Sequence, residues 1–118
     1  MTNARTLYPN IPHVLTEFGS VCVRGLRGNP KEGRFSEDFC GTFLQEKWKT
    51  IMTNPQIKGM IIWCWADYRH HRLFLPSKAG IGLQVTYGPF GMVTIDRKPK
   101  EHFLGIMKEL YTNWQLQA

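Results

Sequence analysis

Apolar residues recur along the chain in four segments, two with the alternation of β-strands and two with the spacing of α-helices. The first strand is predicted over residues 12–18, where β-branched and aromatic residues are followed by a stop at Gly19. Successive side chains of a strand point to opposite faces, so His13, Leu15 and Glu17 should share one face. The pattern therefore places a carboxylate at the end of the predicted strand.

The second patterned segment is an amphipathic helix that we expect to begin after Ser36, a typical N-cap residue. Glu37 and Asp38 follow it and suit the positive end of the helix dipole. The helix should end before Pro55. Its apolar stripe has helical spacing and consists of Cys40, Phe43, Leu44, Trp48, Ile51 and Met52.

A second strand is predicted over residues 57–66 and, after a long loop, a last helix follows. Both faces of this strand are largely apolar, which indicates burial on both sides, as in a parallel sheet. One face carries Trp63, Trp65 and, just beyond the strand, Asp67. The last helix should begin at about Pro99, because proline is favoured at the first position of a helix.

The order strand, helix, strand, helix predicts an α/β fold built as one βαβα unit. A helix that connects two buried strands acts as a crossover, so the sheet should be parallel. Two strands cannot form a buried parallel sheet by themselves, because their edges and faces need further cover. The chain therefore either associates with copies of itself or is a piece of a larger α/β domain, and we expect the second.

The composition is that of one globular domain, with 118 residues of which 42% are apolar and 13% aromatic. The net charge of +6 comes from basic residues spread over several loops, which is typical of a solvated surface, so we expect no nucleic-acid partner. No apolar run approaches the roughly 18 residues that span a bilayer, so we expect no membrane partner. The polar N-terminal segment lacks the apolar core of a secretory signal, which favours a cytoplasmic location unless the true N-terminus lies upstream.

The cysteines and histidines do not indicate a metal site. Cys22, Cys40 and Cys64 are odd in number and lack the spacing of metal ligands. His70 and His71 are adjacent in a loop and have no obvious further ligands nearby in the sequence. We therefore expect reduced thiols, no metal and no cofactor.

Acidic and aromatic side chains gather at the ends of the two predicted strands, as a sugar-cleaving site requires. Glu17 ends the first strand, and Trp63, Trp65 and Asp67 surround the end of the second. A carboxylate can attack or stabilise an anomeric carbon, and an indole ring can stack on a sugar. Simpler alternatives remain open at this point: Glu17 as a solvated carboxylate, the two tryptophans as core residues, and Asp67 as the cap of the following loop.

Three motifs occur in an order that resembles a known family. They are Thr-Glu-Phe-Gly at residues 16–19, the tryptophan-rich segment at 59–68, and Gly-Met-Val-Thr-Ile-Asp-Arg-Lys-Pro-Lys at 91–100. They resemble the C-terminal end of the catalytic barrel in glycoside hydrolase family 2, which includes β-galactosidases, β-glucuronidases and β-mannosidases. The resemblance covers residues 11–114 and implies that the whole chain, 1–118, is a fragment of a (β/α)8 TIM-barrel domain, namely strands seven and eight with their helices.

The resemblance also implies roles for single residues. Glu17 matches the nucleophile of a retaining mechanism, and Trp63 matches the tryptophan that borders the sugar subsite. Trp65 and Asp67 are the further candidates for substrate contacts. Family members often have a cis peptide after the matching tryptophan, here between Trp63 and Cys64. The implied substrate is a β-linked glycoside.

The chain also departs from the family pattern. The acid/base glutamate of the family follows an Asn on strand four, and this sequence has no Asn-Glu pair. Residues 88–90 lack the Asn-x-Lys motif of β-glucuronidases, which disfavours glucuronides, and Phe90 replaces the Asn of many β-galactosidases. We therefore expect a fragment of a retaining β-glycosidase that carries the nucleophile but not the acid/base and is inactive alone. The alternatives are a non-catalytic carbohydrate-binding or interaction module, and a structural piece that complements a separate chain with the remaining barrel strands.

Overall fold

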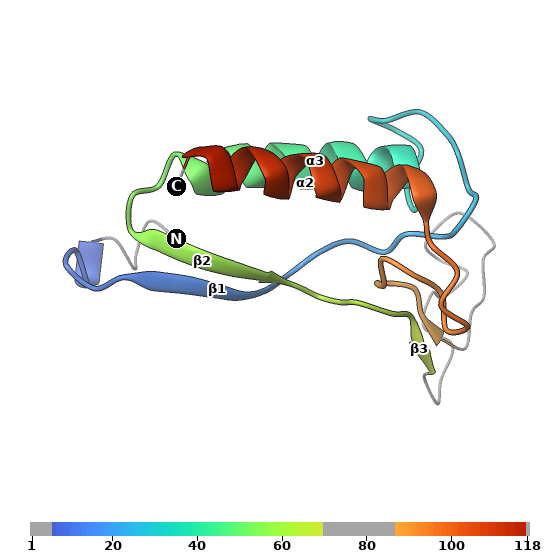
Figure 1. Cartoon of the computed structure of the whole chain (residues 1–118), viewed down its shortest axis with the longest axis horizontal. Helices are drawn as coiled ribbons and strands as arrows, with labels where there is room; N and C mark the ends of the chain where they lie inside the picture. The colour runs from blue at the N-terminus through green and yellow to red at the C-terminus, as the bar shows by residue number, and fades with distance from the viewer. Residues whose placement is uncertain (1–5, 70–86, 118) are drawn as a thin grey trace.

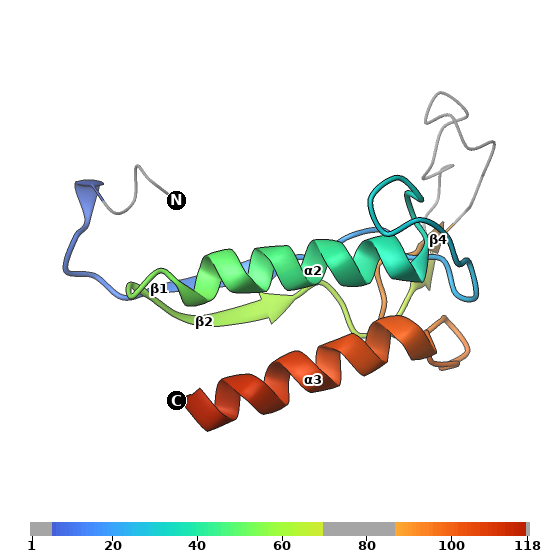
Figure 2. The same ribbon diagram turned by 90° about the horizontal axis from the view of Figure 1, so that it is seen from above.

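The computed structural model describes residues 6–69 and 87–117, and it has two layers, a small sheet and a pair of helices (Figure 1). Along the chain the main elements are β1 (His13–Phe18), α2 (Glu37–Met52), β2 (Ile57–Ile62) and α3 (Glu101–Gln117). A second, antiparallel pair consists of β3 (Tyr68–Arg69) and β4 (Tyr87–Gly88). Figure 2 shows α2 lying along β1 and β2, with α3 beside it. The predicted order of strand, helix, strand, helix is confirmed.

β1 and β2 pair in parallel, as the helical crossover predicts, but the pairing is irregular near the end of β1. Leu15 lies opposite Met60 and Phe18 lies opposite Ile62, so three steps on β1 match two steps on β2. This bulge shifts the alternation, and Leu15 and Phe18 both pack against the helix-covered core. The prediction that Glu17 shares a face with Leu15 is therefore wrong, and Glu17 is exposed.

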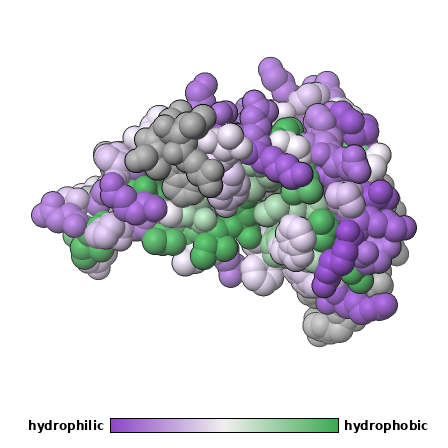
Figure 3. Space-filling view, viewed as in Figure 1, coloured by the Kyte–Doolittle hydropathy of each residue, from purple (hydrophilic) through white to green (hydrophobic). Residues whose placement is uncertain are grey.

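β2 is shorter than predicted and is covered on one side only. It ends at Ile62 and not at residue 66. Met60 is buried beneath the helices, whereas Ile61 and Val14 are each 57% exposed. The prediction of burial on both faces is wrong for the described part of the chain, because both helices lie on the same side of the sheet (Figure 1). In Figure 3 apolar side chains are visible low in the view, where β1 and β2 lie.

α2 begins as the sequence predicts. The Ser36 hydroxyl accepts a hydrogen bond from the Phe39 amide at 3.1 Å, which satisfies one of the free amides of the first turn. The buried face of α2 packs on the sheet and on α3 in two clusters. Their buried members are Cys22, Cys40, Leu44, Phe103 and Met107 in the first, and Trp48, Ile51 and Met60 in the second.

α3 begins at Glu101, two residues later than predicted. Pro99 is still extended, because it forms an antiparallel bridge with Val93. The carboxylate of Glu37 lies at the start of this helix, where it accepts hydrogen bonds from the Phe103 amide at 3.2 Å and from the Gly25 amide at 2.8 Å. Glu37 therefore connects the start of α2, the loop before it and the start of α3. No described helix is long and apolar enough to cross a membrane.

Candidate functional site

The carboxyl ends of β1 and β2 open into a cleft of about 320 Å³. Its size lies at the lower end of the range for small-molecule sites, roughly 300–1,000 Å³. The lining is aromatic apart from one glycine and one carboxylate, and it consists of Glu17, Phe18, Gly19, Trp63, Tyr68 and Phe90. The structure thus brings two of the predicted site residues, Glu17 and Trp63, to one cleft.

Glu17 has the exposure that a reacting carboxylate requires. The bulge in β1 turns it away from the helix-covered core, in which Leu15 and Phe18 pack. Within the described residues, its carboxylate has no hydrogen-bond or ion-pair partner. A bulge beside a functional site often re-aims one side chain in this way. The carboxylate is therefore available to a ligand in the cleft.

Trp63 is held beside Glu17 by the backbone that continues the sheet. Its amide donates to the Phe18 carbonyl at 2.9 Å, which extends the pairing of the two chains beyond β2. The Trp63–Cys64 peptide is cis, as the resemblance implied. A side chain at Gly19 would collide with the Trp63 carbonyl oxygen, so only glycine fits there. The Trp63 side chain remains 44% exposed and offers part of its ring to the cleft.

Tyr68 and Phe90 complete the aromatic lining, and sequence reasoning did not select either as a site residue. The Trp63 indole N–H donates to the Tyr68 hydroxyl at 3.4 Å, and the two rings meet edge to face with centroids 5.9 Å apart. The Phe90 carbonyl accepts from the Cys64 amide at 3.2 Å, which fixes the backbone of Phe90 beside the turn after Trp63. The place of Tyr68 at the end of the tryptophan-rich motif, residues 59–68, is the sequence feature that could have identified it as a site residue.

Trp65 and Asp67 were predicted to contact substrate with Trp63, but neither lines this cleft. Trp65 is 60% exposed. The Asp67 side chain is only 4% exposed and accepts hydrogen bonds from the Gly91 amide and the Lys100 ammonium, both at 2.7 Å. The strand alternation that grouped them fails because β2 ends at Ile62.

Cys22 and Cys64 are not poised as nucleophiles. The hydrogen bond with Cys40, together with burial, raises the pKa of the Cys22 thiol well above its ordinary value. Burial also raises the pKa of Cys64. A thiol reacts as the thiolate, so a raised pKa suppresses reactivity near neutral pH.

Metal binding has no support from the described residues, in which no three His, Cys, Asp or Glu side chains are grouped as ligands. Arg69, at the end of β3, is the last described residue before the segment 70–86. His70 and His71, which the sequence predicts to be poor metal ligands, lie outside the described residues.

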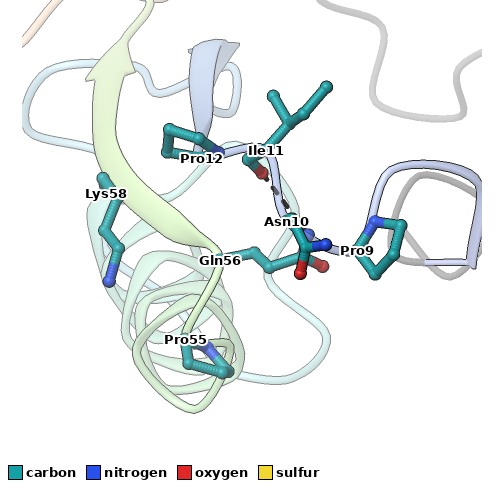
Figure 4. Close-up of a pocket in the computed structure, with 7 residues that line it drawn as sticks. All are labelled: Pro9, Asn10, Ile11, Pro12, Pro55, Gln56 and Lys58. Carbon is teal, nitrogen blue, oxygen red and sulfur yellow. Dashed lines mark hydrogen bonds between the residues drawn. The ribbon is translucent and has the colours of Figure 1, made fainter.

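A second pocket, of about 490 Å³, lies at the opposite ends of the strands (Figure 4). The Gln56 amide group crosses it and donates to the carbonyls of Tyr8 at 2.6 Å and Ile11 at 3.4 Å. Its lining has neither a carboxylate nor an aromatic ring and consists of Pro9, Asn10, Ile11, Pro12, Pro55, Gln56 and Lys58. Of the two, only the cleft at Glu17 offers groups suited to chemistry on a sugar.

No family model and no curated protein matches the chain. Solved structures do match it. A β-glucuronidase from Ruminococcus gnavus aligns with 95% of this chain at 22% identity and a TM-score of 0.76. The same bacterium's enzyme in complex with N1-substituted uronic isofagomine aligns with 93% at 23% identity and a TM-score of 0.75. A β-glucuronidase from Faecalibacterium prausnitzii aligns with 86% at 25% identity and a TM-score of 0.67.

The likeness concerns the fold, and it covers a small part of the larger proteins. The chain spans 18% of the first Ruminococcus gnavus protein and 16% of the Faecalibacterium prausnitzii protein. The two parallel strands and two helices of this chain are therefore arranged as in one segment of these glycosidase structures.

Proposed function

We propose that the chain is the C-terminal piece of a retaining β-glycosidase barrel and that Glu17 is its nucleophile. The observation that carries this proposal is the exposed carboxylate of Glu17 at a strand end, without a partner among the described residues, in a cleft that it shares with the Trp63 ring. Active sites of (β/α)8 barrels lie at the carboxyl ends of the strands. The solved structures compared above, which are named as β-glucuronidases, support the same origin.

In the proposed reaction, Glu17 attacks the anomeric carbon of a β-linked glycoside and the glycosidic oxygen leaves. A second carboxyl group protonates that oxygen and then removes a proton from the water that cleaves the glycosyl-enzyme. In retaining enzymes the two carboxyl groups lie about 5–5.5 Å apart. The cleft lining contains one carboxylate, Glu17, so the second has to come from outside this part of the chain.

The uncovered face of the sheet supports the proposal that the chain is a fragment. Val14, Ile61 and Trp65 are large apolar residues, and each is more than half exposed on or beside the two strands. In a closed barrel the corresponding faces are covered by the other strands and their side chains. We propose that these missing strands, on the same chain in the cell or on another one, are the partner of this face.

Aryl β-glycosides provide the direct test. The purified chain should release no aryl alcohol from β-galactosides, β-glucosides, β-mannosides or β-glucuronides, because it lacks the acid/base group. Turnover that disappears in Glu17→Gln but persists in the control Glu46→Gln would contradict the claim of an incomplete site. Glu46 is an exposed carboxylate on α2, so it matches the charge change without touching the cleft.

The aromatic lining favours neutral sugars over glucuronides. Among the described residues that line the cleft, Glu17 is the only charged one, and a second carboxylate on the ligand would be repelled by it. Phe90 lines the cleft close to where the resemblance places the carboxylate-binding motif of β-glucuronidases. We propose a neutral β-linked pyranoside as the ligand.

A non-catalytic carbohydrate-binding module is the second candidate function. It is favoured by the exposure of two neighbouring indoles, Trp63 at 44% and Trp65 at 60%. A titration of tryptophan fluorescence with phenyl β-galactoside and phenyl β-glucoside tests it. Saturable quenching that is lost in Trp63→Ala, with no hydrolysis by the wild type, supports binding without catalysis. The absence of any saturable change counts against this function.

A further inference from the structure

Lys100 is a buried lysine that the proposed chemistry does not use. Its side chain is 0% exposed. The ammonium donates to the Cys22 carbonyl at 2.6 Å, to an Asp67 carboxylate oxygen at 2.7 Å and to the Pro89 carbonyl at 3.4 Å. An ammonium has three donors and no acceptor, so these contacts use its full capacity.

The three acceptors belong to three separate segments, and each segment contributes to the cleft. Asp67 directly precedes Tyr68, and Pro89 directly precedes Phe90, both of which line the cleft. Cys22 lies three residues after Gly19, which also lines it. One ammonium therefore connects the three chain segments from which the walls of the cleft are built.

Further hydrogen bonds tie the same segments to one another. The Cys22 amide donates to the Pro89 carbonyl at 2.7 Å, and the Gly91 amide donates to Asp67 at 2.7 Å. The oxygen of Asp67 that accepts from Gly91 also accepts from Lys100. We call these four segments, centred on Cys22, Asp67, Pro89 and Lys100, the lysine clamp.

Because Lys100 is buried, its ammonium needs all of its hydrogen-bond acceptors to be in place. A buried charge is tolerated only when it is paired and its remaining donors are hydrogen-bonded. The ammonium therefore stabilises only those arrangements in which all three loops converge on it. A merely apolar contact is non-directional and would not fix their relative positions in this way.

We propose that Lys100 is a positioning residue for the cleft, and that it sets the placement of Tyr68, Phe90 and the chain after Glu17 through Asp67 and the two carbonyls. It touches no ligand itself, because its side chain is fully buried. The inference deepens the proposed function and rests on it only for the identity of the ligand. The position of the walls is measurable without any sugar.

The test uses the Trp63 indole N–H, which donates to Tyr68 and so reports how the Tyr68 ring, beside Asp67, lies against Trp63 in the cleft. Its resonance is recorded in a proton–nitrogen NMR spectrum and assigned with Trp63→Phe. The double variant Asp67→Asn/Lys100→Met removes the clamp while leaving no unpaired buried charge. We expect it to fold and to shift the Trp63 indole resonance or to lose it through exchange. An unshifted resonance in the folded double variant would overturn the proposal.

A matched control separates positioning from general destabilisation. Ile51→Ala removes a buried side chain near the C-terminal end of α2, and Ile51 itself does not line the cleft. It should lower stability but leave the Trp63 indole resonance in place. An equal displacement in Ile51→Ala would mean that any weakening of the fold moves this signal, and the proposal would be abandoned.

A measurement on the wild type keeps the proposal testable if the double variant does not fold. The amides of Cys22 and Gly91 lie in different loops, but both are held by groups that Lys100 binds. If the clamp opens as one unit, the two amides share the same protection from hydrogen exchange. Protection factors that differ by about tenfold or more would show independent opening and would overturn the proposal.

Glycoside titrations distinguish this inference from the proposed function. If the clamp positions the walls and the cleft binds a sugar, the double variant binds phenyl β-galactoside more weakly than the wild type. If the wild type binds no sugar but its Trp63 resonance moves in the double variant, the proposed function fails and the role of Lys100 stands.

Discussion

Two carboxylates that the sequence groups into one site lie in opposite environments. Glu17 is exposed in an aromatic cleft and has no partner among the described residues. Asp67 is buried in the lysine clamp, with Lys100 and the Gly91 amide bound to it. Burial and pairing, not residue type, separate a carboxylate that is available to a ligand from one that holds loops together.

The difference follows from how each charge is solvated. A buried carboxylate requires a counter-charge and hydrogen bonds, because water no longer stabilises it. An exposed carboxylate requires neither and keeps its lone pairs free. The fold therefore depends strongly on Asp67 and weakly on Glu17, whereas the proposed chemistry depends on Glu17.

The largest effect should come from breaking the buried pair. Lys100→Met leaves Asp67 charged and unpaired, and we expect the free energy of unfolding to fall by about 3–5 kcal/mol. Lys98→Met is the matched control, because Lys98 is 61% exposed and its ion pair with Asp96 is on the surface. The control should cost at most about 1 kcal/mol. Urea denaturation measures both, and similar losses would show that the clamp is energetically unimportant.

Glycine substitutions should show a smaller difference in stability between the tightly packed backbone beside Asp67 and an open position on α3. A side chain at Gly91 would collide with backbone atoms of Ala66, Asp67 and Val93, so Gly91→Ala should cost about 1–3 kcal/mol through overpacking. Gly105 lies on α3 with open space around it, so Gly105→Ala should raise stability by about 0.5–1 kcal/mol. Thermal or urea unfolding of both variants checks the signs, and a neutral Gly91→Ala would contradict the tight packing beside Asp67.

A third carboxylate provides an intermediate case with a pH signature. The two hydrogen bonds from Arg27, helped by the Gly28 amide, hold the pKa of Asp38 well below its usual range. A carboxyl group with a lowered pKa in the folded state stabilises the protein above its unfolded pKa, about 3.9, and this contribution disappears as the pH falls.

The stability of the wild type should therefore decline from about pH 5 downward more steeply than that of Asp38→Asn, with urea midpoints as the measurement. Arg27→Gln removes the partner of Asp38, and its stability should likewise decline less steeply below about pH 5 than that of the wild type. Added salt should reduce the difference, because Arg27 is exposed and the pair is screened. If the stability of the wild type, Asp38→Asn and Arg27→Gln declined equally with falling pH, the lowered pKa of Asp38 would be contradicted.

The elements and their order could be predicted because local patterns determine them. Ser36 begins α2 as its N-cap, and the two strands pair in parallel. The prediction that Glu17 and Leu15 share one face of β1 was wrong, because a bulge changes the alternation and no local sequence pattern marks that bulge. The partner of Asp67 was missed because Lys100 lies 33 residues away in the sequence.

Sequence reasoning also failed where a β-bridge competes with the helix preference of a single residue. Pro99 is a favourable first residue for a helix, but its bridge with Val93 keeps it extended and delays α3 to Glu101. Tyr68 and Phe90 reach the cleft only through the folding of the loops around the clamp. Such contacts depend on tertiary structure and carry no periodic signal.

The most direct test compares Glu17→Gln with Asp67→Asn in parallel urea denaturations. Both substitutions neutralise a carboxylate with almost no change in shape. The free energy of unfolding should stay within about 0.5 kcal/mol of the wild type for Glu17→Gln. It should fall by about 3–5 kcal/mol for Asp67→Asn, which leaves Lys100 buried without its counter-charge. Equal losses, or a larger loss for Glu17→Gln, would contradict the division between a free carboxylate and a structural one.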